Sequence, residues 1–379
     1  MVITAEARQI KQLAHEIARD KLGPHASEID RNFGFPREGL RYLAEAGLMG
    51  LTVPTAFGGA GADTVSFVEA TQEIAQACAS TALVFVTHLT ACTGILVGGS
   101  EHLKEEYLPA LAKGDKMGAF AATESGCGAN VFALQTAALR DDHGPYRVKG
   151  SKVFITSGGE ADVYLVAVWT GPGPAGLSLL LMDKGTPGLT FGRKDRRLGM
   201  NGTSSSEVFL DDCCVPFGNL LGREGAYMAV AMPMVGVALL GTAAIAVGLA
   251  EAALQASIEH AKTRKVNGQS LGTYQGIQFL ISEMSAQIEA ARCLLYEAAQ
   301  ARDRGPTPLP ILPFQAKYFA TEMAVDVTNK ALQIHGGQGY TQALPVERYF
   351  RDTRGLTLHF TPTEMLKETL GKMLLGMFP

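Results

Sequence analysis

The sequence has little excess charge of either sign and no paired cysteine motif. It holds 33 lysines and arginines against 37 aspartates and glutamates, so the formal net charge is −4. Nucleic-acid binding needs clustered cations for the phosphates, and without a basic stripe the sequence argues against such a partner. The six cysteines form no C-x-x-C pair and lie too far apart for a compact disulfide framework, which suits a reducing cytoplasm. We also predict no metal site.

The N-terminus lacks the apolar core of a signal peptide, because charged residues recur throughout MVITAEARQIKQLAHEIARDKL. One uncharged run, residues 226–250, is nevertheless long enough to span a membrane. Pro233 and several glycines interrupt this run and no aromatic belt flanks it, so we favour a helix at the centre of a soluble bundle. The sequence therefore predicts a cytoplasmic protein without a membrane span.

Three regions with different periodicity follow one another along the chain. Apolar residues recur at helical spacing in residues 1–116 and again, over longer stretches, in residues 226–379. Residues 117–225 instead hold short segments rich in Val, Leu, Tyr and Phe, separated by Gly and Pro. We predict an α+β multidomain protein with an N-terminal α-helical domain, a central β domain and a C-terminal four-helix bundle. The expected strands are 146–156, 163–170, 177–183, 189–194 and 205–210, and the expected bundle helices are 226–265, 274–304, 313–335 and 361–377.

Two glycine-bearing turns are candidates for ligand contact. TESGCGAN (123–130) joins the first helical region to the β domain, and HGGQGY (335–340) lies between two helices of the last region. Glycines let the backbone approach a ligand and expose N–H donors. Neither turn fits the G-x-G-x-x-G dinucleotide fingerprint. Each turn alone is as consistent with a plain loop as with a binding loop.

Five motifs in a fixed order carry a resemblance to a known family. They are TESGCGAN (123–130), KVFITSGGEAD (152–162), RLGMNGTSSSEVFLDDCCVP (197–216), RKVNGQSLGTYQGIQFLISEM (264–284) and QIHGGQGYTQALPVERYFRDTR (333–354). Together they resemble the acyl-CoA dehydrogenase superfamily over nearly the whole chain. The resemblance implies the three-domain organisation described above and one FAD for each subunit.

Four residues are implied to meet the flavin within one subunit. By resemblance, Thr123 and Glu124 line the edge of the flavin. Phe154 packs on the isoalloxazine ring and Thr156 bonds near its reactive nitrogen. Taken alone, Phe154 is more typical of a plain core aromatic.

Five further residues are implied to hold the FAD of a neighbouring subunit. By resemblance, Arg264 and Gln275 reach across, and the Arg264 guanidinium suits a pyrophosphate. Gln333, Gly336 and Gly337 hold the adenosine side of the same FAD. Alone, Arg264 is also typical of an ordinary surface cation. A homotetramer is implied.

The sequence departs from the family where a glutamate usually removes the α-proton of the thioester. Phe360 occupies that position, and phenylalanine cannot take a proton. Some members carry the glutamate early in the first bundle helix, but there the matching residue is Ala238. The later Glu364 fits a capping box that starts at Thr361. The chain therefore resembles an atypical member of the family that lacks the usual catalytic glutamate.

Two histidines are candidates for the missing proton transfer. His359 adjoins Phe360, and an ordinary histidine pKa near 6.5 suits proton transfer at neutral pH. His88 belongs to a helix that lines the substrate pocket in the family, where it is either an acid or base or else a pocket or core histidine.

Three functions remain open at this point. The first is an FAD-dependent oxidoreductase on an acyl-CoA or acyl-carrier thioester, with a non-standard proton-transfer step. Such an enzyme could desaturate with another base, reduce an enoyl thioester, or eliminate a substituent as desulfinase- and decarboxylase-like members do. The second is a flavin-dependent monooxygenase, and the third a non-catalytic flavin or acyl-CoA binding protein. The resemblance also implies an electron-transfer flavoprotein as partner.

Overall fold

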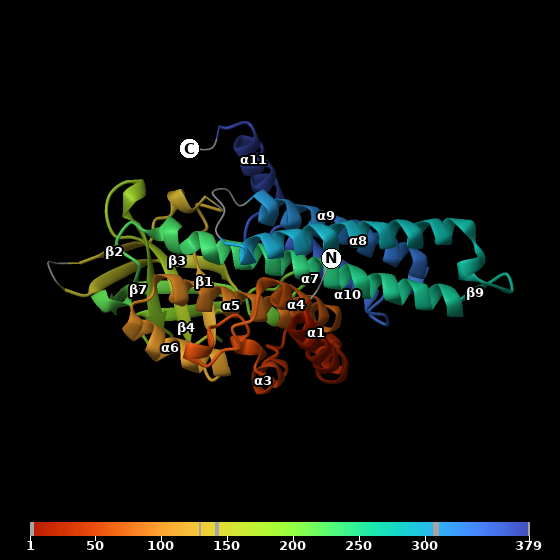
Figure 1. The fold of residues 1–379 in the computed structure, drawn as a ribbon, viewed down its shortest axis with the longest axis horizontal. Coiled ribbons are helices and arrows are strands. Elements are labelled where there is room, and N and C mark those ends of the chain that lie inside the picture. The colour runs from red at the N-terminus through yellow and green to blue at the C-terminus, as the bar shows by residue number, and fades with distance from the viewer. Residues whose placement is uncertain (1–3, 129, 141–143, 306–310, 378–379) are drawn as a thin grey trace.

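The computed structural model describes residues 4–128, 130–140, 144–305 and 311–377, and it has a helical, a sheet and a second helical part (Figure 1). The predicted fold class is confirmed. The domain limits after residues 116 and 225 stay a prediction. Capping side chains begin three of the N-terminal helices: Thr4, Asp63 and Ser100 each accept a hydrogen bond from the backbone N–H three residues later. These N-terminal helices are α1 (Ala5–Ile17), α2 (Gly23–Asn32), α3 (Arg37–Glu45), α4 (Thr64–Ala77), α5 (Ala79–Gly98) and α6 (Glu101–Lys113).

The central part is an eight-stranded sheet in the order β6-β7-β3-β2-β4-β5-β8, with β1 parallel to β4. All five predicted strands are present, and two of them, β5 and β6, have the predicted bounds. The sequence missed β1, β2 and β8, because strands of two to four residues are too short to show a periodicity. The strands are β1 (Gly118–Ala121), β2 (Ala137–Leu139), β3 (Tyr146–Ile155), β4 (Val163–Trp169), β5 (Leu177–Asp183), β6 (Leu189–Lys194), β7 (Ser206–Val215) and β8 (Leu220–Leu221).

The last part consists of long helices and one short hairpin. The helices are α7 (Tyr227–Thr263), α8 (Gln275–Asp303), α9 (Ile311–His335), α10 (Val346–Leu356) and α11 (Thr363–Leu374), and the hairpin pairs β9 (Lys265–Val266) with β10 (Gln269–Ser270). The sequence did not predict α10, in which Arg351 forms ion pairs with Glu347 and with Asp30 of α2. The capping box at Thr361 is wrong: Pro362 holds the N-cap position of α11 and no side chain caps it.

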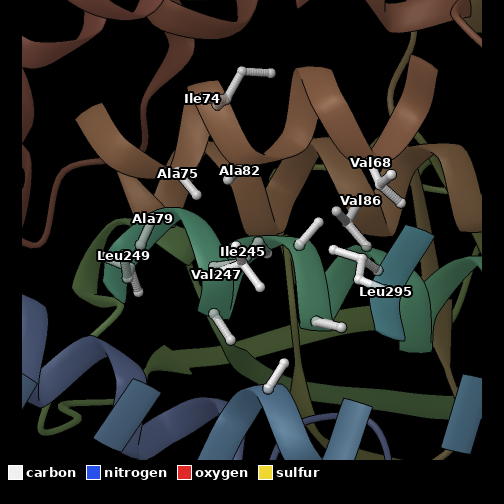
Figure 2. Packing of buried hydrophobic residues seen from close by; sticks show 14 of the residues in the cluster. Val68, Ile74, Ala75, Ala79, Ala82, Val86, Ile245, Val247, Leu249 and Leu295 are labelled. Carbon is white, nitrogen blue, oxygen red and sulfur yellow. The ribbon is translucent and has the colours of Figure 1, made fainter. Parts of the chain in front are cut away.

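Helix α7 lies at the centre of the molecule, as its uncharged sequence predicts. Its apolar side chains, including Ile245 and Val247, belong to one buried cluster with Ala82 and Val86 of α5 (Figure 2). A Cβ at Gly241 would lie 2.5 Å from a methyl group of Val86, so glycine permits this close packing. Helices α5 and α7 are long and apolar enough to cross a membrane, but 72% and 83% of their most apolar windows are buried, as in core helices.

Candidate active site

A cavity of about 660 Å³ lies where the two helical parts meet the sheet. Its walls come from α5, from the first turns of α7, from the loop after β1, from the end of β3 and from the loop between α10 and α11. Most of the lining is apolar, and its charged side chains are arginines. Among the described residues no aspartate or glutamate lines it. The cavity is therefore suited to an apolar ligand and offers no carboxylate.

Phe154 and Thr156 lie at one wall of this cavity, as the resemblance implied. The pairing of β3 with β7 shifts register between Lys152 and Ile155, and within this irregularity Phe154 has a φ of 58°. The Phe154 side chain is consequently 68% exposed, which contradicts the plain-core alternative. An accessible aromatic face beside a polar hydroxyl fits a planar, hydrogen-bonding ring such as that of FAD.

Glu124 does not face the cavity, in contrast to its predicted place at the flavin edge. Its carboxylate accepts hydrogen bonds from Lys152 Nζ at 2.7 Å and from the backbone N–H groups of Gln135 and Thr136 at 2.7 and 3.0 Å. Burial alone would raise the pKa of Glu124, but the Lys152 ammonium and the Thr136 hydroxyl outweigh it and lower that pKa. Thr123 does line the cavity. Glu124 thus positions the loop that carries Thr123.

His88 lies behind the cavity and not in it. Its Nε2–H donates to the Met49 carbonyl at 3.0 Å, and its Nδ1 accepts from the Gly118 N–H at 3.2 Å. The cavity face of α5 instead carries Thr87 and Thr90. Burial lowers the pKa of His88 to about 4, so it is neutral at physiological pH. This geometry contradicts an acid–base role and fits the core-histidine alternative.

His359 and Phe360 both line the cavity, from the loop between α10 and α11. The His359 Nδ1 lies 3.5 Å from the Thr242 hydroxyl of α7. Burial, with the nearby Lys317 and Arg197 charges, lowers the pKa of His359 to about 3. The imidazole is therefore uncharged at pH 7 and is a weak proton acceptor.

The two positions at which the family carries its glutamate meet at the same cavity. Ala238 of α7 and Phe360 of the α10–α11 loop both belong to its lining, although 122 positions separate them in the sequence. Phe360 has a φ of 61°, and its ring lies 6.0 Å from that of Phe120 in β1. An aromatic pair thus occupies the place where a carboxylate would act.

Sequence reasoning missed Lys317, which fixes the loop carrying His359 and Phe360. Lys317 is fully buried in α9, and its ammonium donates to the carbonyls of Thr357 and Thr361 at 3.3 and 2.8 Å. Burial lowers the pKa of Lys317 to about 8. No periodicity could reveal this residue, because its partners lie forty or more positions away.

The remaining predicted FAD contacts lie at the opposite end of the helical part (Figure 1). Arg264 follows α7 twenty-six residues after Ala238, which places it about 39 Å further along the helix axis. The rings of His260 and His335 lie 4.3 Å apart, so the ends of α7 and α9 meet there. All five residues that the resemblance assigns to this end are exposed: Arg264, Gln275, Gln333, Gly336 and Gly337. They cannot reach the cavity of their own chain.

The residues that the resemblance assigns to FAD thus form two separated half-sites in one chain. One half-site is the cavity wall with Phe154 and Thr156, and the other is the exposed end with Arg264 and the turn at Gly337. A Cβ at Gly337 would meet no atom within 4 Å, so the turn is open to a ligand. Within the described ranges no group of three His, Cys, Asp or Glu side chains could hold a metal ion.

Known proteins match this chain from end to end. Residues 4–115, 119–213 and 228–375 match the N-terminal, middle and C-terminal domains of acyl-CoA dehydrogenase. The chain is 38% identical to an acyl-CoA dehydrogenase of Bacillus subtilis (strain 168), over 99% of this chain and 100% of that one. It is also 38% identical to acryloyl-CoA reductase (NADH) of Anaerotignum propionicum, over 98% and 94%. The structure of butyryl-CoA dehydrogenase from Megasphaera elsdenii gives a TM-score of 0.96 at 34% identity, over 99% of each chain.

These matches agree with the observed order of helical, sheet and helical parts. They cover four of the five motifs of the sequence resemblance in full and the motif at 197–216 up to residue 213. Enzymes of this kind are FAD-dependent and act on acyl-CoA thioesters. The chain belongs to the acyl-CoA dehydrogenase family.

Proposed function

We propose that this flavoenzyme acts on an acyl thioester without using a carboxylate for proton transfer at C2. Ordinary dehydrogenation removes a proton from C2 and a hydride from C3 of the thioester. FAD, when bound, supplies the acceptor for that hydride. The observation that carries the proposal is the apolar pair Ala238 and Phe360, which line one cavity in which no described residue offers a carboxylate. A positioned base contributes a factor of about 10² to 10⁴, so its loss should be large.

The remaining residues of the cavity bind and orient more readily than they move protons. The buried wall of α5, with Leu83 and Val86, suits an apolar acyl tail. Phe154 and Phe360, which both line the cavity, would shield a bound planar ring from water. His359 is neutral at pH 7 and lies near two cations, so it is a poor base. The missing carboxylate slows desaturation and its reverse, the reduction of an enoyl thioester, alike, because both pass through the same transition state. The lining by itself therefore favours an elimination that needs no proton transfer at C2. The similarity to a chain named acryloyl-CoA reductase supports the reductive direction.

Anaerobic mixing with a thioester panel tests the proposal. Saturated acyl-CoAs should perturb the flavin spectrum on binding but bleach it slowly. Enoyl-CoAs should reoxidise the chemically reduced protein, with the saturated product found by mass spectrometry. Rapid bleaching by a saturated acyl-CoA would contradict the proposed proton step. Oxygen consumption with reduced flavin and no thioester turnover would indicate a monooxygenase. A protein that stays colourless after reconstitution with FAD would overturn the flavin assignment.

We further propose that the working unit is an oligomer, with a homotetramer as the family-like form. Arg264 and Gln275 are exposed and lie far from the cavity of their own chain, so a second copy must present them to each FAD. An electron-transfer flavoprotein is the proposed redox partner, and an acyl-carrier thioester is an alternative to acyl-CoA.

A further inference from the structure

The tyrosines that are buried in the described residues differ in one respect. Five of them are less than a tenth exposed. In four, the hydroxyl bonds to the protein: Tyr107 to Asp183 at 2.8 Å, Tyr146 to Glu224 at 2.6 Å, Tyr164 to the Ser157 carbonyl at 3.2 Å, and Tyr296 to Glu69. The fifth, Tyr227, is 5% exposed, and its hydroxyl has no hydrogen bond to any described residue. The hydroxyl is not among the fully enclosed polar atoms that lack a partner, so it is open to the cavity and can bond to water or a ligand there.

Tyr227 lies in the wall of the cavity. It is the first residue of α7 and lines the cavity together with Cys127, Gly128 and Val131 from the loop after β1. Two other hydroxyls of the lining, on Thr87 and Thr90, already donate to backbone carbonyls of α5. Burial raises the pKa of Tyr227, so the phenol stays protonated at neutral pH and is a donor.

Tyr227 lies on the same face of α7 as Ala238 but at the other end of the cavity wall. Ala238 follows eleven residues later, which at about 100° per residue returns to the same helix face, about 16 Å along the axis. The loop beside Tyr227 is largely exposed, whereas Leu83 and Val86 on the α5 wall are buried. The open rim must admit the polar arm of a thioester, because the floor is apolar.

We propose that the Tyr227 hydroxyl donates a hydrogen bond to an oxygen of the bound thioester and so contributes to substrate recognition. This inference rests on the proposed function and deepens it. Two parts of the ligand offer such an acceptor. One is an amide carbonyl of the pantetheine arm, which CoA and carrier-protein thioesters share. The other is a hydroxyl oxygen carried by the acyl chain.

Binding measurements on the flavin-loaded protein distinguish these sources. For Tyr227→Phe we expect the Kd to rise by about three- to tenfold, the value of one hydrogen bond. The probes are butyryl-CoA, butyryl-pantetheine and 3-hydroxybutyryl-CoA, with the affinity read by calorimetry. A contact to the arm weakens all three, whereas a contact to the acyl oxygen weakens only the hydroxylated probe. Equal affinities of Tyr227→Phe and wild type for all three would overturn the inference.

Tyr296→Phe is the matched control, because its hydroxyl has a protein partner in Glu69 and it lies outside this cavity. It should lower the Tm and leave thioester binding unchanged. Tyr227→Phe should not lower the Tm of the ligand-free protein, because no protein hydrogen bond is lost. A wild type that binds none of the probes contradicts the proposed function. If the wild type binds the probes and Tyr227→Phe binds them equally tightly, only the role of Tyr227 is contradicted.

Discussion

At the residue scale, the chemistry of the cavity depends on what Phe360 and Ala238 replace. Both side chains are apolar and both face the space that the acyl group would occupy. The neighbouring His359 does not compensate, since burial and two nearby cations keep it neutral. Phe154 and Thr156 are the residues that the resemblance assigns to the flavin, and no described aspartate or glutamate lines the cavity beside them.

Phe360→Glu should return a carboxylate to the cavity. We expect saturated acyl-CoA to bleach the flavin about 10²-fold faster or more, because a positioned base contributes on this order. Stopped-flow absorbance under anaerobic conditions measures the rate. Phe360→Gln is the control, with nearly the same shape and no charge. If the Glu variant is no faster than the Gln variant, the missing carboxylate does not limit the reaction.

His88 should make the protein less stable in acid. Its pKa is about 4 when folded and about 6.5 when unfolded, so the unfolded chain binds the extra proton as the pH falls below 6.5. The stability that neutral His88 contributes is fully present above pH 6.5 and falls as the pH drops to 4. At pH 5 the free energy of unfolding is lower by about 2 kcal/mol. Urea unfolding at pH 7.5 and 5.0 measures it. His88→Gln should lose less stability between these values, and an equal loss would contradict the assignment.

At the element scale, Glu124 connects three strands to the loop that borders the cavity. Its carboxylate bonds to Lys152 of β3 and to the backbone just before β2, and it follows β1 closely. Both partners are buried, with Lys152 wholly so. A buried ion pair of this kind is costly to break on one side only.

Glu124→Gln should leave the Lys152 ammonium buried without its counter-charge. The expected loss is about 3 kcal/mol in the free energy of unfolding, measured with urea. The double variant Glu124→Gln with Lys152→Met is the control and should lose less than the single one, because no isolated charge remains. A double variant that is less stable than the single one would show that packing, and not the charge, dominates.

At the scale of the whole molecule, α7 runs from one half-site to the other and its length keeps them apart. With 37 residues it is about 55 Å long. Its first turns line the cavity, and its end carries the hairpin with Arg264 (Figure 1). One chain therefore carries the two half-sites far apart, and in the proposed oligomer a symmetric pair of chains completes two flavin sites.

Subunit complementation tests this arrangement. Arg264→Met impairs the part offered to a neighbour, and Thr156→Val impairs the cavity of the same chain. Each variant alone should retain little FAD, measured by the ratio of flavin to protein absorbance. When the two are co-expressed, about a quarter of the sites should recover, because a mixed pair contains one intact combination. No recovery in mixed oligomers of normal size would show that both residues serve the same chain.

The sequence alone determined the order of the three parts, five strands of the sheet, the buried character of α7 and the motifs of the family. These features depend on short-range periodicity and on runs of neighbouring residues, which the sequence displays directly. Only the tertiary structure decided that Glu124 turns inward, that His88 is held by Met49 and Gly118, and that Arg264 lies far from the cavity. Such facts depend on the direction of a side chain and on partners distant in the sequence, which packing alone fixes.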